Sequence, residues 1–264
     1  MTTLSADVGD DGQVRAMVRE VVSTHGRLDV VVSAAGVVAY GRTEEVPVEV
    51  FDGVLRTNLL GSANLARHVV PQLRAQRSGT LLLVGSVIGH VAVPTMSAYV
   101  VSKWGVRALA RQLRIENRDL PGVRVLYVAP GGVDTPIYDQ AANYAGLAGR
   151  PPPPAVSAAR TARQVLRRVE GARAPEQLSL LNHGLVAAFQ WLPRLYDALV
   201  GAVFPLGATD LRRPVPPGPG NVLTPRPEVD AEDGHHGSSV LGVLGNLVAS
   251  RRGPRRDRGG DAGG

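Results

Sequence analysis

Apolar residues follow two alternating patterns along most of this chain. Short runs rich in valine and leucine predict strands at residues 2–8, 28–36, 79–86, 123–130 and 177–181. Between most of them, apolar residues recur three and four positions apart and predict helices at about 10–25, 48–74, 98–120 and 157–170. Strands that alternate with helices in this way are typical of a parallel sheet with helices on its faces. We therefore expect an α/β fold built on such a sheet, with 28–36 as a buried strand.

The chain is expected to divide into three segments. Residues 1–206 carry the α/β pattern and form the main domain, although residues 131–154 show no clear period, end in four prolines and predict a loop or lid. Residues 207–238 are rich in proline and glycine and are expected to lie extended on the surface. Residues 239–264 combine a short amphipathic stretch with an arginine- and glycine-rich tail, which we expect to be disordered.

Composition narrows the range of functions. The 264 residues include no cysteine, which excludes disulfides and thiolate metal sites and fits a cytoplasmic protein. The formal net charge is +6, but five arginines stand in the last fourteen residues, where no aromatic side chain interleaves for base stacking. No nucleic-acid partner is therefore expected. The adjacent His235 and His236 have no further ligand at metal-binding spacing, so we expect a loop there and no metal site.

The only lysine of the chain, Lys103, follows Tyr99 by four residues within the predicted helix 98–120. Residues four apart lie on one face of a helix, so both side chains are expected to point toward the edge of the sheet where open α/β folds bind ligands. A free tyrosine loses its proton near pH 10, and a nearby cation favours the phenolate. The lysine would therefore lower the pKa of Tyr99 toward neutrality and make it usable as an acid or a base.

Further segments place polar residues and glycines at the ends of the predicted strands. SAAG (33–36) ends one strand, and TNLLG (57–61) contains Asn58. Ser86 stands at the end of the next strand, where its hydroxyl could hold a carbonyl oxygen, and PGGVDTP (130–136) follows the strand after that. Each segment alone is a weak signal, but their combination and order are specific.

The order SAAG, Asn58, Ser86, Tyr99, Lys103 and PGGVDT resembles the short-chain dehydrogenase/reductase family from its fourth strand onward. The resemblance covers roughly residues 2–200 and implies a Rossmann-like parallel sheet with flanking helices. It also implies hydride transfer between NAD or NADP and an alcohol or carbonyl carbon. The choice between NAD and NADP stays open.

The resemblance assigns roles by position. Tyr99 would be the general acid in reduction and the general base in oxidation, and Ser86 would hydrogen-bond the substrate oxygen. Lys103 would lower the pKa of Tyr99 and bind the nicotinamide ribose, while Asn58 would hold a water that links Lys103 to solvent. The remaining expected cofactor contacts are Asp7 and Val8 near the adenine, Ala35 and Gly36 along the adenine ribose, and Pro130, Gly131, Val133 and Thr135 along the nicotinamide and its phosphate.

Part of the family pattern has no counterpart in the sequence. The family begins with a strand, a TGxxxGxG turn, a helix and a second strand, and neither these first two strands nor the Gly-rich loop is found here. One explanation is a misplaced start or a fragment of a complete oxidoreductase. The other is a non-catalytic truncated homologue with an interaction or regulatory role. We favour the first, because Ser86, Tyr99 and Lys103 keep their spacing. Without those strands, residues 2–8 must pair beside 28–34 or stay unpaired.

The substrate and partners are predicted only by class. Apolar residues of the lid, among them Ile137, Tyr138, Tyr144 and Leu147, suggest a lipophilic alcohol or ketone. The resemblance implies a homo-oligomer that pairs through the helices 48–74 and 98–120. For the apolar region 185–206 we favour closure over a substrate or a subunit interface, while contact with a membrane surface there or at 240–252 stays open.

Overall fold

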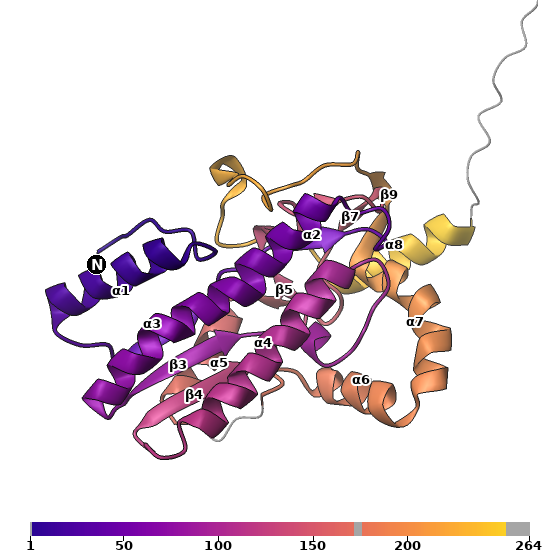
Figure 1. Cartoon of the computed structure of the whole chain (residues 1–264). Helices are drawn as coiled ribbons and strands as arrows, with labels where there is room; N and C mark the ends of the chain where they lie inside the picture. The colour runs from indigo at the N-terminus through magenta and orange to yellow at the C-terminus, as the bar shows by residue number, and fades with distance from the viewer. Residues whose placement is uncertain (1, 172–175, 252–264) are drawn as a thin grey trace, which may run out of the picture.

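A parallel sheet covered by helices forms the centre of the computed structural model, which describes residues 2–171 and 176–251 (Figure 1). The sheet contains β1 (Val30–Ser33), β3 (Gly79–Val84) and β4 (Val123–Val128) in the order β1-β3-β4. All pairs are parallel, with Val30 opposite Thr80 and Thr80 opposite Arg124. The expected α/β fold is therefore confirmed.

The helices lie on both faces of this sheet. Helices α3 (Gly61–Gln76) and α4 (Ser97–Glu116) cross in front of it in Figure 1, and α5 (Ala158–Val169) lies behind. Helix α1 (Asp11–His25) packs along α3 and starts where predicted, because the side chain of Asp10 accepts a hydrogen bond from the backbone N–H of Gln13 at 3.0 Å. The main apolar core fills the space between α1, α3, α4, β3 and β4.

The predicted helix 48–74 is continuous but changes its winding in the middle. It consists of α2 (Val48–Leu55), a π turn, η1 (Arg56–Leu60), and α3. Val50 and Val54 of α2 are buried in a second apolar cluster with Val222. Residues of α3 such as Leu65 are buried in the main core. The π turn therefore lies where the helix stops packing against the second cluster and begins packing against the main core.

Two predictions near the N-terminus are wrong. Residues 2–7 form no strand, and β1 pairs only with β3 in the described sheet, so its other edge stays unpaired. The strand at 28–36 is also not fully buried, since Val30 is 46% and Val32 is 41% exposed. Alternate residues of a strand point to opposite faces, and only the face with Val31 is covered by the main core.

The segment predicted as a loop or lid contains short strands. These are β5 (Val133–Asp134), β6 (Ala142–Asn143) and β7 (Leu147–Gly149), which pair with β8 (Val156–Ser157), β2 (Ala39–Tyr40) and β9 (Thr209–Pro214). Their partners are distant in sequence, so no local period reveals them. The strand predicted at 177–181 reduces to a single bridge between Gln177 and Ala129, because α6 (Leu180–Trp191) begins within that segment.

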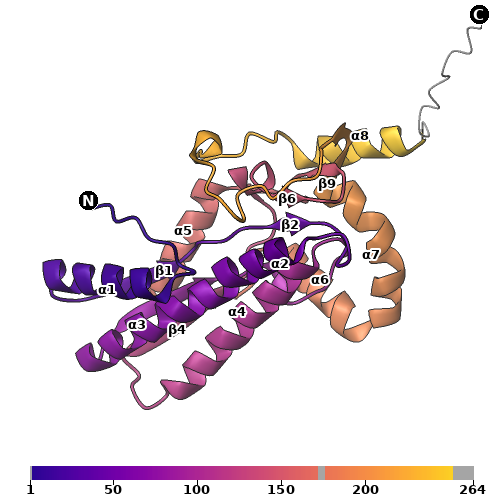
Figure 2. The same ribbon diagram turned by 45° about the horizontal axis from the view of Figure 1, so that its top comes forward.

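The C-terminal part of the described chain packs against the lid segment. Helix α7 (Pro193–Ala208) leads into β9, and α8 (Ser239–Arg251) lies across the ends of both (Figure 2). Residues 252–264, which hold most of the predicted arginine-rich tail, lie outside the described residues. In the described parts of the chain, no helix is both long and apolar enough to cross a membrane.

Candidate active site

Tyr99 and Lys103 share one face of α4, as their spacing predicts. The Nζ atom of Lys103 lies 5.6 Å from the centre of the Tyr99 ring. Lys103 is 6% exposed, and its ammonium donates a hydrogen bond to the backbone oxygen of Val84 at 3.1 Å. Two of its three N–H groups are left without a protein acceptor among the described residues. They are therefore available to a bound ligand.

Ser86 faces the same tyrosine from the end of β3. It caps the 3-10 turn η2 (Val87–Gly89), because its Oγ accepts a hydrogen bond from the backbone N–H of Ile88 at 3.2 Å. Its hydroxyl also interacts with the phenol of Tyr99 and lowers the pKa of that phenol. Beneath it, the phenol of the buried Tyr127 donates to the Ser86 carbonyl at 3.4 Å. Both the backbone and the hydroxyl of Ser86 are thus held toward Tyr99.

Asn58 completes the cluster from the π turn η1. Its Oδ1 accepts from the N–H of Val37 at 2.8 Å, and its Nδ2 donates to the Val37 carbonyl at 2.9 Å. Nδ2 also donates at 2.9 Å to the hydroxyl of Ser102, which in turn donates to the Tyr99 carbonyl at 2.8 Å. π turns within helices are frequent at functional sites, and here the π turn directs the side chain of Asn58 toward α4.

Gly36 lies between Asn58 and Lys103. A Cβ atom at this position would lie 3.3 Å from Asn58 Oδ1 and 3.7 Å from Lys103 Nζ. A side chain would therefore crowd both polar groups, whereas glycine leaves the approach to the ammonium open. This is a cradle in which a sugar hydroxyl could meet Lys103.

Burial dominates the protonation of the pair. It raises the pKa of Tyr99 to about 12, which the interaction with Ser86 partly offsets, and it lowers the pKa of Lys103 to about 8. The expected lowering of the Tyr99 pKa by Lys103 is not found, because the loss of water around the phenol dominates and only the interaction with Ser86 opposes it. At neutral pH, Tyr99 is a protonated phenol that can donate.

The residues expected around the adenine occupy one end of the site. Asp7 accepts from the N–H of Gly9 at 2.8 Å and lies 3.3 Å from the guanidinium of Arg56. Val8 packs against Gly61, the first residue of α3, and its carbonyl accepts a hydrogen bond from Asn64. Ala35 is exposed just beyond β1. Asp7 and Val8 thus hold the loop between the N-terminal segment and α1 on the helix that carries Asn58.

The residues expected around the nicotinamide follow β4. The carbonyl of the buried Pro130 accepts from the N–H of Val87 at 2.9 Å, which ties this segment to η2 and hence to Ser86. Gly131 lies against Asn182, whose Oδ1 would be 3.0 Å from a Cβ at that position. Val133 of β5 pairs with Val156 of β8, and Thr135 precedes the 3-10 turn η3 (Pro136–Tyr138). The structure brings this segment beside Ser86.

An apolar cavity of about 470 Å³ opens next to these residues. Val87, the neighbour of Ser86, lies at one side of it, and Gly131 and Gly132 lie at another. The remaining wall comes from residues 152–154 and from apolar side chains of α6 and α7. Phe204 of α7 lines the cavity and also packs in the cluster that contains Tyr99. The cavity is therefore suited to an apolar ligand close to the tyrosine.

Two residues that the sequence did not single out support this site. Ser102 is fully buried and joins Asn58 to α4. Tyr40 packs with Tyr99 in one cluster, together with Tyr138 of the expected lid. Ser102 could have been found from its position, since it lies three residues after Tyr99 on the same helix face. Tyr40 comes from a short strand distant in sequence, and no local pattern marks it.

Comparisons with known proteins bear on the identity of this arrangement. A family model described as short chain dehydrogenase matches residues 1–144. A 3-oxoacyl-acyl-carrier-protein reductase of Staphylococcus aureus is 36% identical over 136 residues, which make up 52% of this chain and 55% of the relative. An uncharacterised NAD-dependent oxidoreductase of Mycobacterium tuberculosis is 36% identical over 146 residues, or 55% of this chain and 53% of the relative. The chain thus spans about half the length of these curated relatives.

Among solved structures, a short-chain dehydrogenase from Streptomyces avermitilis has the same fold, with a TM-score of 0.60. The match covers 74% of this chain and 77% of that protein, at 23% identity. The likeness extends beyond the residues covered by the family model.

Proposed function

The chain belongs to the short-chain dehydrogenase family, and we propose that it transfers a hydride between NAD or NADP and a lipophilic alcohol or ketone. The observation that carries this proposal is the convergence of the partly buried Tyr99 with the buried Ser86, Lys103 and Asn58 at the C-terminal edge of the sheet. The NAD-dependent oxidoreductase relative supports the same reaction class.

Tyr99 acts as the acid in reduction and the base in oxidation. Its phenol, with a pKa raised to about 12 by burial, is protonated at neutral pH and ready to give a proton to a substrate oxygen. Ser86 donates a hydrogen bond to the same oxygen and stabilises its developing charge. The nicotinamide, when bound, supplies or accepts the hydride. Asn58 holds Ser102 and α4 in place, and its carbonyl accepts a hydrogen bond from a water molecule that links Lys103 to solvent.

Two groups of residues are proposed to bind the cofactor, one at its nicotinamide end and one at its adenine end. The free N–H groups of Lys103, reached past Gly36, fit the hydroxyls of the nicotinamide ribose. Ala35 would contact the adenine ribose, and Asp7 and Val8 would contact the adenine. Pro130, Gly131, Val133 and Thr135 would hold the nicotinamide and its phosphate.

The apolar cavity supports the choice of substrate class. A 3-oxoacyl group, which the name of the Staphylococcus aureus relative specifies, is a ketone on an apolar chain. A ligand of this kind buries its chain against α6 and α7 while its oxygen meets Ser86 and Tyr99. The proposal includes self-association through the continuous helix of α2, η1 and α3 and through α4, on which Leu60, Val101 and Ile115 are about half exposed.

A second candidate is a non-catalytic interaction protein. It is favoured by one observation, the lack of a TGxxxGxG turn within the 264 residues. Such a turn presents free backbone N–H groups and a helix N-terminus to the pyrophosphate. The two candidates differ in whether the folded chain binds a dinucleotide.

The test is titration of the 264-residue chain with NADH and NADPH, followed by quenching of Trp104 and Trp191 fluorescence. Saturable binding is expected, and Lys103→Met is expected to weaken it by about tenfold or more, because hydrogen bonds to a charged donor are lost. Arg19→Met, at an exposed arginine of α1, is the matched control and is expected to bind normally. Absence of binding by the folded wild-type chain would exclude the enzyme for this chain and favour the interaction role.

Turnover separates chemistry from binding. With a panel of apolar ketones and NADPH or NADH, Tyr99→Phe is expected to reduce the rate by about 10²–10⁴-fold while cofactor binding persists, because only the proton donor is removed. Equal rates for Tyr99→Phe and wild type would contradict the assigned role of the tyrosine.

A further inference from the structure

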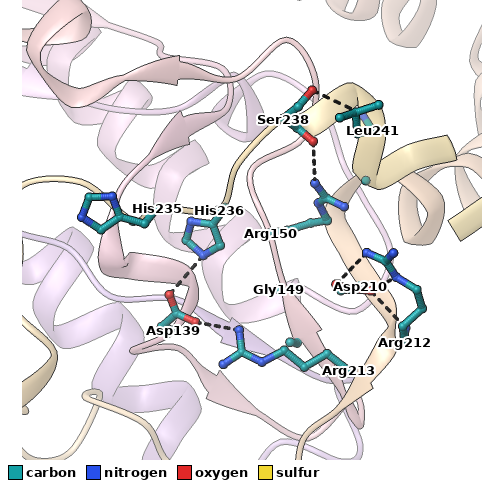
Figure 3. A pocket seen from close by; sticks show the side chains of 13 residues that line it. Asp139, Gly149, Arg150, Asp210, Arg212, Arg213, His235, His236, Ser238 and Leu241 are labelled. Atoms are coloured by element: carbon teal, nitrogen blue, oxygen red, sulfur yellow. Dashed lines mark hydrogen bonds and ion pairs between the residues drawn. The ribbon is translucent and has the colours of Figure 1, made fainter. Parts of the chain in front are cut away.

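A polar pocket of about 430 Å³ lies apart from the active site, between the lid segment and the C-terminal helix (Figure 3). Its walls come from β7 and the following Arg150, from β9, from residues 234–238 and from the start of α8. Its charged lining residues are Arg150, Arg212, Arg213, Asp139 and Asp210, together with the histidines His235 and His236. None of these residues takes part in the proposed hydride transfer.

The positive charge of Arg150 has no ion-pair partner among the described residues. It is 5% exposed, and one of its guanidinium N–H₂ groups donates to the backbone oxygen of Ser238 at 3.3 Å. Its Nε is buried without a hydrogen-bond partner, and no carboxylate of the described residues lies within 4.0 Å of the guanidinium. Asp210 is near enough for Arg150 to help lower the pKa of its carboxyl group, but Asp210 is already paired with Arg212. A buried charge without an ion-pair partner of its own is costly, so this cation favours an anionic ligand.

The position of Arg150 at α8 adds to this imbalance. Its guanidinium occupies the space that a Cβ on Gly242, in the first turn of α8, would take. The N-terminal turn of a helix carries partial positive charge and favours an anion over a cation. The helix end and the arginine therefore repel each other, and an anion bound beside the guanidinium in the pocket would offset both charges.

The other charged groups of the pocket are largely paired. Arg212 holds Asp210 with its Nε at 3.0 Å, and Arg213 holds Asp139 at 3.1 Å. These bonds leave Nη1 of Arg212 without a partner among the described residues. This nitrogen lies over Gly245, which follows Gly242 by one turn of α8.

His236 lies between two carboxylates behind this wall. Its Nδ1 is 2.6 Å from Asp134, and its Nε2 is 3.1 Å from Asp139. Its ring also packs edge-on against Tyr138, with 5.4 Å between ring centres, and Tyr138 belongs to the cluster around Tyr99. The expectation of a simple loop at His235 and His236 is therefore incomplete, since His236 fastens residues 234–238 to the lid segment.

We propose that this pocket binds an oxyanion, the phosphate or carboxylate group of a small molecule, between Arg150, Arg212 and the N-terminus of α8. The oxyanion accepts hydrogen bonds from the guanidinium N–H₂ groups of Arg150, only one of which has an acceptor among the described residues, and from Nη1 of Arg212, which the bonds to Asp210 leave unused. Its charge compensates the buried arginine and the helix end together. Binding consequently fastens α8 to the lid segment, and it requires no dinucleotide.

The experiment is a calorimetric titration of the 264-residue chain with inorganic phosphate and, separately, with citrate, at constant ionic strength set by sodium chloride. Saturable binding of either anion is expected; phosphate alone or citrate alone would identify which oxyanion the pocket prefers. Heat no greater than that of chloride for both anions would overturn the proposal.

Four variants locate the binding. Gly242→Ala displaces the Arg150 guanidinium without changing any charge, and it is expected to weaken binding by about tenfold or more. Gly201→Ala, in α7 with open space around the new methyl group, is its matched control and is expected to bind as wild type does. Arg212→Gln removes one donor, and Arg42→Gln, an exposed arginine paired with an acid two residues away, is its control. Equal affinity of wild type, Gly242→Ala and Arg212→Gln would show that the anion binds elsewhere and would overturn the proposal.

Discussion

Replacement of Lys103 by methionine is expected to stabilise the protein at neutral pH. Burial lowers the pKa of Lys103 from 10.5 to about 8, which corresponds to about 3 kcal/mol against the charged form. Methionine keeps the apolar stem but leaves the Val84 carbonyl without its hydrogen bond, which costs about 1 kcal/mol. Lys103→Met is therefore expected to raise the free energy of unfolding by about 2 kcal/mol at pH 7. The proposed cofactor site would be lost in the same variant.

The effect depends on pH in a defined direction. Below about pH 8, Lys103 is charged in both the folded and the unfolded state, so the penalty in the wild type is complete. Between about pH 8 and 10.5 the unfolded chain keeps a proton that the folded chain has lost, and the wild type gains stability as the pH rises. The advantage of Lys103→Met is thus constant below about pH 8. It then shrinks by up to about 1.4 kcal/mol per pH unit.

Urea unfolding followed by circular dichroism, at several pH values between neutral and about pH 10, measures this difference. Arg19→Met removes an exposed arginine of α1 and is expected to show a small difference from the wild type that does not change with pH. The reasoning fails if Lys103→Met is less stable than the wild type at pH 7. It also fails if its advantage is the same at pH 8 and pH 10.

Two further predictions concern groups that support the site. Burial, together with the positive charge of Arg107, lowers the pKa of His90 to about 4. Between about pH 6.5 and pH 4 the unfolded chain therefore binds a proton that the folded chain does not bind. Up to about 3 kcal/mol of stability is expected to be lost as the pH falls through this range. His90→Phe is expected to flatten this part of the urea-midpoint profile, and an unchanged slope would contradict it. A Cβ on Gly85 would overlap the buried ring of Tyr127, so Gly85→Ala is expected to cost about 2–3 kcal/mol. Gly201→Ala, in the middle of α7 with open space around the new methyl group, is expected to stabilise by about 0.5–1 kcal/mol, and equal thermal midpoints of the two variants would refute this.

The sequence predicted the parts of the fold and site that depend on local pattern. The helix 10–25 and the strands 79–86 and 123–130 are found within a few residues of their expected ends, because caps and apolar periods act over one or two turns. The convergence of Tyr99 and Lys103 follows from helix geometry alone. Their protonation could not be predicted, since it depends on how much of the phenol and ammonium the tertiary structure buries.

The short strands and the polar pocket were not predictable in this way. β7 pairs with β9, and Arg150 meets Ser238, across separations of roughly sixty to ninety residues. No period or motif in either segment indicates such a partner. The absence of a strand at residues 2–7 has a similar origin, because a strand forms only where a neighbour supplies hydrogen bonds.

The π turn at Arg56–Leu60 sets the angular phase between α2 and α3. In an unbroken α-helix, Val54 and Leu65 would face almost the same direction, because eleven residues make about three full turns. The π turn rotates the second half by about a quarter of a turn, so that α2 serves the cluster with Val222 and α3 serves the main core. A single-residue deletion within this turn would therefore rotate α3 relative to α2. The side chain of Asn58 would no longer point toward α4, and one of the two apolar clusters would lose the helix face that covers it.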